Sequence, residues 1–192
     1  MARRAVFLDR DGTINRQVGY CGDPAMIELL AGAAEAVRQF NELGLLTIVV
    51  TNQSAVARGL ITEDQVRRVN AEVAIQVARA SGGRFDAFYY APFHPSEGDN
   101  PRYTRDSDWR KPGGGMLRQA ATDFGLELRR CFMVGDADID HLAAKDASPE
   151  LITFQVPSDY AGGNADYDVH SLQEASVKIT ALLGAMEDAS IP

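Results

Sequence analysis

The sequence has little cysteine and no long apolar run. Its two cysteines, Cys21 and Cys131, lie far apart in 192 residues, so neither a disulfide framework nor a cysteine-rich zinc site is indicated. No apolar stretch approaches the ~20 residues that span a bilayer. The apolar segment 5–8 is too short for a signal peptide and is more typical of a buried strand. We therefore expect a cytoplasmic protein with no membrane partner.

Positive charge is also scarce. Lysine and arginine number 19 against 27 aspartates and glutamates, which gives a formal net charge of -8. Nucleic acids and anionic membranes are bound by basic surfaces, so this balance argues against them as partners. An anionic small molecule is compatible with it, because a few local cations can outweigh the charge of the whole chain.

The chain alternates between short apolar segments and segments with helical periodicity. The strand patterns lie at 4–8, 45–50, 85–90, 130–134 and 151–154, and the helical patterns at 33–43, 62–80, 116–124, 139–147 and 172–186. Thr62 and Gln65 form a capping-box pattern at the start of the second helix. This alternation predicts an α/β fold: a three-layer, Rossmann-like parallel sheet of about five strands with helices on both faces.

Two irregular segments interrupt the pattern, near 10–31 and 91–115, and both follow predicted strands. Their length favours functional loops over simple connections. We expect residues 1–192 to form a single domain, with these loops as its only cap. A cap of this kind favours a monomer.

Acidic residues follow two of the predicted strands. Asp9 and Asp11 come after the first strand, and Asp136 and Asp140 after the fourth. Ligands of open α/β sheets bind outside the carboxyl ends of the strands, and carboxylates held close together need a counter-ion such as Mg²⁺. One carboxylate can attack phosphorus while its neighbour acts as acid and base. Taken singly, each pattern also suits a solvated turn or a helix N-terminus.

Hydrogen-bond donors and cations follow the other strands. Thr51 and Asn52 end the second strand pattern, Arg58 lies in the next loop, and Arg110 and Lys111 precede the third helix. Such groups bind phosphate oxygens, although each alone is also typical of an ordinary turn or a solvated surface. Their occurrence together with the acidic residues predicts a phosphoryl-transfer site.

Four segments resemble the motifs of a known family. FLDRDGT (7–13), VTNQS (50–54), RKP (110–112) and VGDADID (134–140) resemble the four motifs of the haloacid dehalogenase (HAD) superfamily, in order and spacing, across residues 5–147. The runs DRDGTIN and TNQSAVARG, with Gly19-Tyr20 and YYAP at 89–92, are similar to the subgroup that contains heptose bisphosphate and histidinol-phosphate phosphatases.

The resemblance implies a covalent mechanism that depends on Mg²⁺. Asp9 is the nucleophile and Asp11 the general acid and base. The Asp9 carboxylate, the backbone carbonyl of Asp11 and the Asp136 carboxylate hold the metal ion. Asp140 supports this site from nearby or binds the metal through water.

The resemblance also implies how substrate is held. Thr51 and Lys111 bind the transferring phosphoryl group, and Asn52 is a further phosphate- or substrate-binding residue. Arg58 and Arg110 contact the substrate outside the reacting phosphate.

The loop after the third strand departs from the subgroup pattern. Members commonly carry a structural zinc there, held as Cys-x-His and Cys-x-Cys. The corresponding positions are Ala91, Phe93, Ser107 and Trp109, none of which is a normal zinc ligand. We expect no structural zinc, and we expect packing of Phe93, Tyr103 and Trp109 to order the loop.

The resemblance implies a magnesium-dependent phosphomonoesterase that removes the C7 phosphate of D-glycero-D-manno-heptose 1,7-bisphosphate. Three alternatives stay open: a histidinol-phosphate or other small-metabolite phosphatase, a catalytically silent module that binds a phosphorylated ligand, and a nucleic-acid 3′-phosphatase. The presence of Asp9, Asp11, Lys111 and Asp136 argues against a silent module. The acidic charge balance argues against a nucleic-acid substrate.

Overall fold

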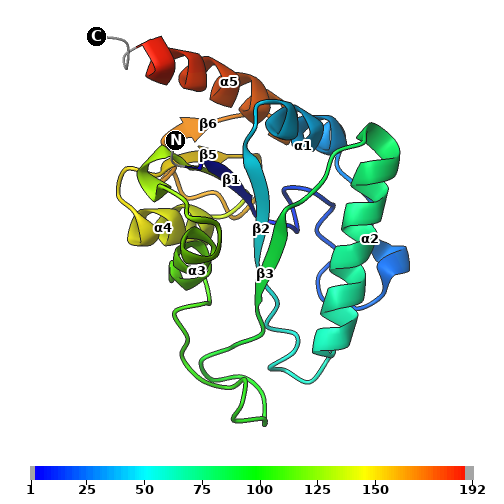
Figure 1. Ribbon diagram of the computed structural model, residues 1–192. Helices are drawn as coiled ribbons and strands as arrows, with labels where there is room; N and C mark the ends of the chain where they lie inside the picture. The colour runs from blue at the N-terminus through cyan, green and yellow to red at the C-terminus, as the bar shows by residue number, and fades with distance from the viewer. Residues whose placement is uncertain (1–2, 189–192) are drawn as a thin grey trace.

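The computed structural model describes residues 3–188 and contains a six-stranded parallel sheet (Figure 1). The strand order is β3-β2-β1-β4-β5-β6. The strands are β1 (Ala5–Leu8), β2 (Leu46–Asn52), β3 (Ala87–Ala91), β4 (Phe132–Gly135), β5 (Ile152–Gln155) and β6 (Tyr167–Asp168). The predicted α/β fold is confirmed. The sequence analysis missed β6, because this strand is only two residues long and is exposed, so it carries no apolar pattern.

Within the described residues, five α-helices cover the sheet. They are α1 (Ala33–Glu42), α2 (Glu63–Ser81), α3 (Gly115–Phe124), α4 (Asp138–Ala147) and α5 (Leu172–Asp188), with short 3-10 turns at η1 (Pro24–Met26) and η2 (Leu128–Arg130). Helix α2 begins at the predicted capping box of Thr62 and Gln65. No helix of the described residues is long and apolar enough to cross a membrane.

The two faces of β1 belong to different hydrophobic cores. Val6 and Leu8 pack in the core formed with α1, α2 and α5. Ala5 and Phe7 pack in the core formed with α3 and α4. This alternation follows from the two-residue period of a strand, and it requires a strand apolar on both faces, as β1 is. The expected three layers are therefore present, with helices on both sides of the sheet (Figure 1).

Strand β2 extends further than its apolar pattern suggests. Its prediction ended at residue 50, but Thr51 and Asn52 continue the parallel ladder opposite Tyr90 and Ala91. The polar side chains hid this extension, because backbone pairing rather than apolar character holds these residues in the strand. Strand β4 also begins later than predicted, after the turn η2.

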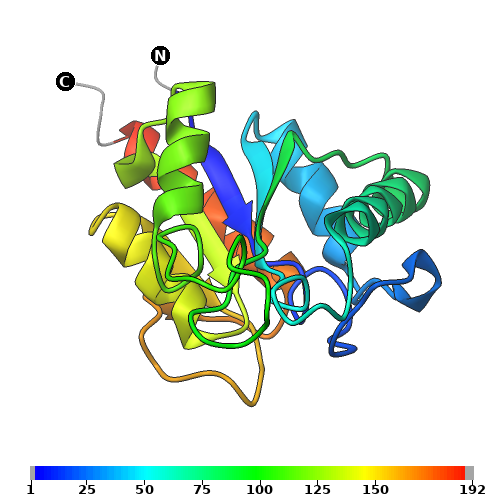
Figure 2. The same ribbon diagram turned by 90° about the horizontal axis from the view of Figure 1, so that it is seen from below.

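The sheet reverses its direction of growth at β1. The chain runs outward through β2 and β3, then returns to place β4 on the other side of β1. In such sheets the ligand site lies at this reversal, at the carboxyl ends of the strands. The loops after the strands gather at this end of the molecule, which Figure 2 views directly.

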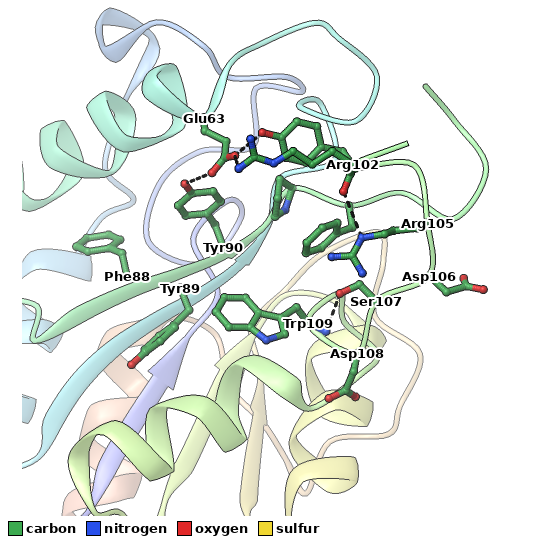
Figure 3. A pocket seen from close by; sticks show the side chains of 13 residues that line it. Glu63, Phe88, Tyr89, Tyr90, Arg102, Arg105, Asp106, Ser107, Asp108 and Trp109 are labelled. Carbon is green, nitrogen blue, oxygen red and sulfur yellow. Dashed lines mark hydrogen bonds and ion pairs between the residues drawn. The ribbon is translucent and has the colours of Figure 1, made fainter. Parts of the chain in front are cut away.

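The loop between β3 and α3 is held by aromatic contacts and hydrogen bonds (Figure 3). The rings of Tyr89 and Trp109 meet edge to face at 6.1 Å, and those of Phe93 and Tyr103 lie 6.5 Å apart. The hydroxyls of Tyr90 and Tyr103 both donate to the carboxylate of Glu63 in the first turn of α2. These contacts surround a cleft of about 760 Å³. The three aromatic residues expected to order this loop therefore take part in its packing.

Candidate active site

Three buried carboxylates converge at the carboxyl ends of β1 and β4. The backbone N–H of Asp9 donates to the carbonyl of Val134 at 3.0 Å, which fixes Asp9 between the two strands. Asp9, Asp136 and Asp140 each present an oxygen, and these oxygens lie within 4.8 Å of one another. The sequence placed these residues on separate segments, and the fold brings them together.

A buried lysine reaches this cluster from the loop before α3. Lys111 Nζ donates to Asp9 Oδ1 at 2.6 Å, to Asp140 Oδ1 at 2.5 Å and to the carbonyl of Val50 at 2.9 Å. Its side chain is 2% exposed. Asp140 is therefore a direct ion-pair partner of Lys111, a closer role than the nearby support expected of it.

The backbone of Lys111 is held in turn by Asn52. The Asn52 side-chain amide donates to the Lys111 carbonyl and accepts from the Lys111 N–H, each at 3.0 Å. Asn52 was expected to bind phosphate or substrate, and in the structure its amide positions the lysine.

The electrostatics of the cluster favour a bound cation. Burial, with the neighbouring charges of Asp140 and Asp136, raises the pKa of Asp9 despite the opposing effect of Lys111. Burial and the charge of Asp140 raise the pKa of Asp136 to about 6. Burial alone would lower the pKa of Lys111, but Asp140 and Asp9 outweigh it and raise that pKa. Lys111 therefore stays charged, whereas the raised pKa values of Asp9 and Asp136 show that this one lysine does not offset the burial and mutual repulsion of the carboxylates.

The donor set fits Mg²⁺. Three carboxylates face a single lysine, and Mg²⁺ prefers such oxygen ligands. The backbone beside them leaves no room for a side chain: a Cβ at Gly12 would lie 2.2 Å from Asp136 Oδ2, and the φ of Gly12 is +87°. Glycine at position 12 thus lets the first loop close around Asp136.

Asp11 lies where two clefts meet. A small cleft of about 130 Å³, the reaction cleft, includes Asp9, Thr51, Lys111 and Asp136 in its lining. A wider cleft of about 400 Å³, the outer cleft, is lined by Asp11, Gln17, Gly19, Tyr20, Asn52, Gln53, Ser54, Ala55 and Tyr160. Asp11, Gln17 and Asn52 line both. A phosphoryl group in the first cleft would therefore leave the rest of its ester in the second.

Four hydrogen bonds hold the Asp11 carboxylate. Arg10 donates to both oxygens, at 3.1 and 2.7 Å, Asn15 donates at 2.9 Å and Gln53 at 3.0 Å. Arg10 is fully buried and also donates to Asn70 Oδ1 of α2 at 2.9 Å. Gln53 further donates to the buried hydroxyl of Thr51 at 3.1 Å.

The two arginines expected to bind substrate lie in loops beside the reaction cleft. Arg58 forms an ion pair with Glu97 and lies over the ring of Tyr20, 5.6 Å from its centroid. Arg110 is half-buried and donates to the carbonyl of Phe93 at 3.3 Å. Burial and the charge of Arg58 lower the pKa of Arg110. Within residues 3–188, Arg110 pairs with no carboxylate.

The structure thus gathers most of the predicted site. Asp9, Asp11, Thr51, Asn52, Lys111, Asp136 and Asp140 all line the reaction cleft, and Arg58 and Arg110 lie outside it. The sequence analysis missed Arg10, Gln53 and Tyr160. Tyr160 follows β5, and the strand-end rule that singled out the earlier residues would have found its loop.

Comparisons with known proteins show the family of the chain. Residues 108–152 match the HAD-hydrolase-like family model. A D-glycero-beta-D-manno-heptose-1,7-bisphosphate 7-phosphatase of Pasteurella multocida is 40% identical over 145 residues, 76% of this chain and 77% of that protein. The D-glycero-alpha-D-manno-heptose-1,7-bisphosphate 7-phosphatase of Burkholderia mallei is 40% identical over 147 residues, 77% of each chain. The chain belongs to this family of HAD-like phosphatases.

Solved structures show the same fold. A putative HAD-like phosphatase from Mesorhizobium loti superposes with a TM-score of 0.83 at 32% identity, covering 94% of this phosphatase and 88% of that chain. The D,D-heptose 1,7-bisphosphate phosphatase of B. bronchiseptica, solved with magnesium and phosphate, superposes with a TM-score of 0.77 at 23% identity. The match covers 94% of this phosphatase and 99% of that chain. The resemblance seen in the sequence motifs is therefore confirmed, and the chain is a phosphoric monoester hydrolase.

Proposed function

We propose that this phosphatase removes the 7-phosphate of a D-glycero-D-manno-heptose 1,7-bisphosphate by way of a phosphoryl group carried on Asp9. One observation carries the chemical part of the proposal: the Asp9 carboxylate is held by Lys111 in a cleft that Asp11 also lines. The names of the relatives supply the substrate part. Those names include both anomers, so the proposal does not extend to the anomer.

The reaction has two steps in this account. An Asp9 carboxylate oxygen attacks phosphorus, the bond from phosphorus to the leaving oxygen breaks, and Asp11 gives that oxygen a proton. In the second step Asp11 takes a proton from water, the water oxygen attacks phosphorus, and the bond to Asp9 breaks to release inorganic phosphate. Lys111 and Thr51 line the cleft in which the charged phosphoryl oxygens would lie.

The arginine pair supports a substrate with a second anionic group. Burial lowers the pKa of His94 most, and the charges of Arg110 and Arg58 lower it further. Arg58 is paired with Glu97, so Arg110 is the cation of this pair that stays available for a substrate anion. Arg58 stacks over Tyr20, which lines the outer cleft. This arrangement suits a second phosphate and disfavours the ammonium group of histidinol phosphate.

Mg²⁺ would be held by Asp9 and Asp136, with the backbone carbonyl of Asp11 and with Asp140 close by. When bound, it neutralises charge on the phosphoryl oxygens and on the carboxylates. Asp140 is also the carboxylate that fixes Lys111, at 2.5 Å, so the same residue supports both the cation and the lysine.

We further propose a cytoplasmic monomer without nucleic-acid or membrane partners. The two buried, free cysteines, which are usual in reducing compartments, support the location. The net charge of -8 supports the absence of nucleic-acid and membrane partners. Light scattering on the purified protein tests the monomer.

The test is phosphate release from a panel of esters, with and without MgCl₂. The panel contains both anomers of heptose 1,7-bisphosphate, heptose 7-phosphate, histidinol phosphate and a nucleoside monophosphate. The proposal predicts Mg²⁺-dependent turnover with the highest kcat/KM on a heptose bisphosphate. Preference for histidinol phosphate would overturn the substrate, and binding without turnover of any ester would indicate the silent module.

A further inference from the structure

The loop between β5 and β6 lies at the end of the sheet that Figure 2 views. Tyr160 lies in this loop, and its side chain is 63% exposed yet lines the outer cleft. Tyr20, 51% exposed, lines the same cleft from the first loop. Two exposed tyrosines thus border the space that a leaving group would enter.

The backbone of Tyr160 is fixed on both sides. Its N–H donates to Ser158 Oγ at 3.0 Å, and its carbonyl accepts from the N–H of Asp138 at 3.3 Å. The side chain, in contrast, makes no hydrogen bond to any residue that the structure describes. The backbone of Tyr160 is therefore held at a defined place, while its exposed ring stays available for contact.

Asp138 ties this loop to the start of α4. Its carboxylate accepts from Asn164 Nδ2 at 2.5 Å, and a Cβ at Gly162 would lie 2.0 Å from its Oδ2. The loop backbone thus packs directly on the Asp138 carboxylate. Asp138 is two residues from Asp136, so the loop is anchored to the element that carries the reaction cleft.

We propose that Tyr160 is a specificity-determining residue, whose ring packs against the non-reacting carbon skeleton of the leaving group. Asp138 is the positioning residue that holds it there. An aromatic ring offers a large, rigid apolar surface with a polar tip, which suits the C–H face and hydroxyls of a sugar. This inference rests on the proposed function, because it assumes that a phosphoryl group occupies the reaction cleft.

The test compares two phosphate donors of different size. One is the sugar phosphate that the wild-type protein hydrolyses best, and the other is acetyl phosphate, whose leaving group is too small to fill the outer cleft. The measured quantity is the ratio of kcat/KM for the sugar phosphate to kcat/KM for acetyl phosphate. Tyr160→Ala is expected to lower this ratio about tenfold, a size typical of one aromatic contact, mainly through KM.

Three further variants sharpen the test. Tyr160→Phe keeps the ring and is expected to retain most of the ratio. Asp138→Ala is expected to lower the ratio in the same way as Tyr160→Ala. The double variant of Tyr160→Ala and Asp138→Ala is expected to lower the ratio no further, because both substitutions act on one contact. Tyr167→Ala, a tyrosine substitution on β6 outside the outer cleft, is expected to keep the wild-type ratio.

Failure of this inference can be distinguished from failure of the proposed function. A wild-type ratio in Tyr160→Ala, or an equal loss in Tyr167→Ala, overturns the inference and leaves the proposed function standing. A wild-type protein that hydrolyses none of the esters overturns both.

Discussion

The side-chain amide of Asn52 and the backbone of Lys111 are joined by two hydrogen bonds of 3.0 Å each. Asn52 ends β2, and Lys111 lies in a loop 59 residues later. This contact fixes the loop at the point from which Lys111 Nζ reaches Asp9 and Asp140. The position of Lys111, the one cation that residues 3–188 place in the carboxylate cluster, therefore depends on the neutral side chain of Asn52.

Asn52→Ala is expected to lower kcat by roughly 10- to 100-fold, the usual size for loss of a partner that orients a catalytic group. KM should change less. Asn52→Asp keeps the acceptor for the Lys111 N–H and loses the donor, so an intermediate kcat is expected. Steady-state kinetics with the best ester of the panel measures both.

Asn41 offers a matched control. Its amide makes the same pair of hydrogen bonds with the backbone of Arg84, at 3.1 and 2.8 Å, outside the reaction and outer clefts. Asn41→Ala should lower the melting temperature while kcat stays at the wild-type value. If Asn41→Ala reduces kcat as much as Asn52→Ala does, the positioning role of Asn52 is wrong.

Gly12 and Gly44 form a second matched pair. Both have positive φ, +87° and +72°, but a Cβ at Gly12 meets Asp136 at 2.2 Å and a Cβ at Gly44 meets nothing within 4 Å. Gly44→Ala should cost about 1–2 kcal/mol of stability from the left-handed backbone alone. Gly12→Ala should have the same backbone cost and should also lose Mg²⁺ binding and turnover, because Asp136 must move. Titration calorimetry with Mg²⁺ and thermal unfolding distinguish the two effects, and unchanged Mg²⁺ affinity in Gly12→Ala would exclude this account of the metal site.

The metal-free protein should lose stability as the pH rises through the range in which the carboxylates ionise. Folding raises the pKa of Asp136 from 3.8 to about 6, so the folded state binds more protons than the unfolded state between these values. The contribution of this bound proton to the free energy of unfolding is present below the lower of the two pKa values and is lost above the higher one. Mg²⁺ replaces the proton, so its effect should grow with pH.

Melting temperatures with and without MgCl₂ measure this effect. The increase caused by Mg²⁺ should be larger at about pH 8 than at about pH 5, and Asp136→Asn should reduce the difference. A Mg²⁺ effect that is independent of pH, or larger in acid, would show that these carboxylates do not hold the metal ion.

The sequence predicted the elements whose signal is local, and it missed contacts that only the fold creates. The apolar run before Asp9 and the capping box at Thr62 each depend on neighbouring residues, so β1 and the start of α2 were found. The burial of Arg10 depends on Asn70, 60 residues away on α2, and no local pattern indicates it. Likewise, the polar character of Asn52 concealed both its place in β2 and its contact with Lys111.

We expect the loop between β3 and α3 to be ordered without zinc. Ala91, Phe93, Ser107 and Trp109 stand at the ligand positions of the subgroup, and none of them is a zinc ligand. Trp109 is the only tryptophan of the chain and packs against Tyr89, so its fluorescence reports on this loop. A zinc-selective chelator, added with Mg²⁺ in excess, should leave the emission unchanged. Stoichiometric zinc in protein purified without chelator, or a shift in emission, would contradict this prediction.

The central claim is that Asp9 carries the phosphoryl group, and rapid acid quenching during turnover tests it most directly. Mass spectrometry of the quenched, digested protein should find a phosphate adduct on the peptide that contains Asp9. The adduct should be absent from Asp9→Asn, which should also release no phosphate. Wild-type turnover by Asp9→Asn, or an adduct on another residue, would contradict the mechanism.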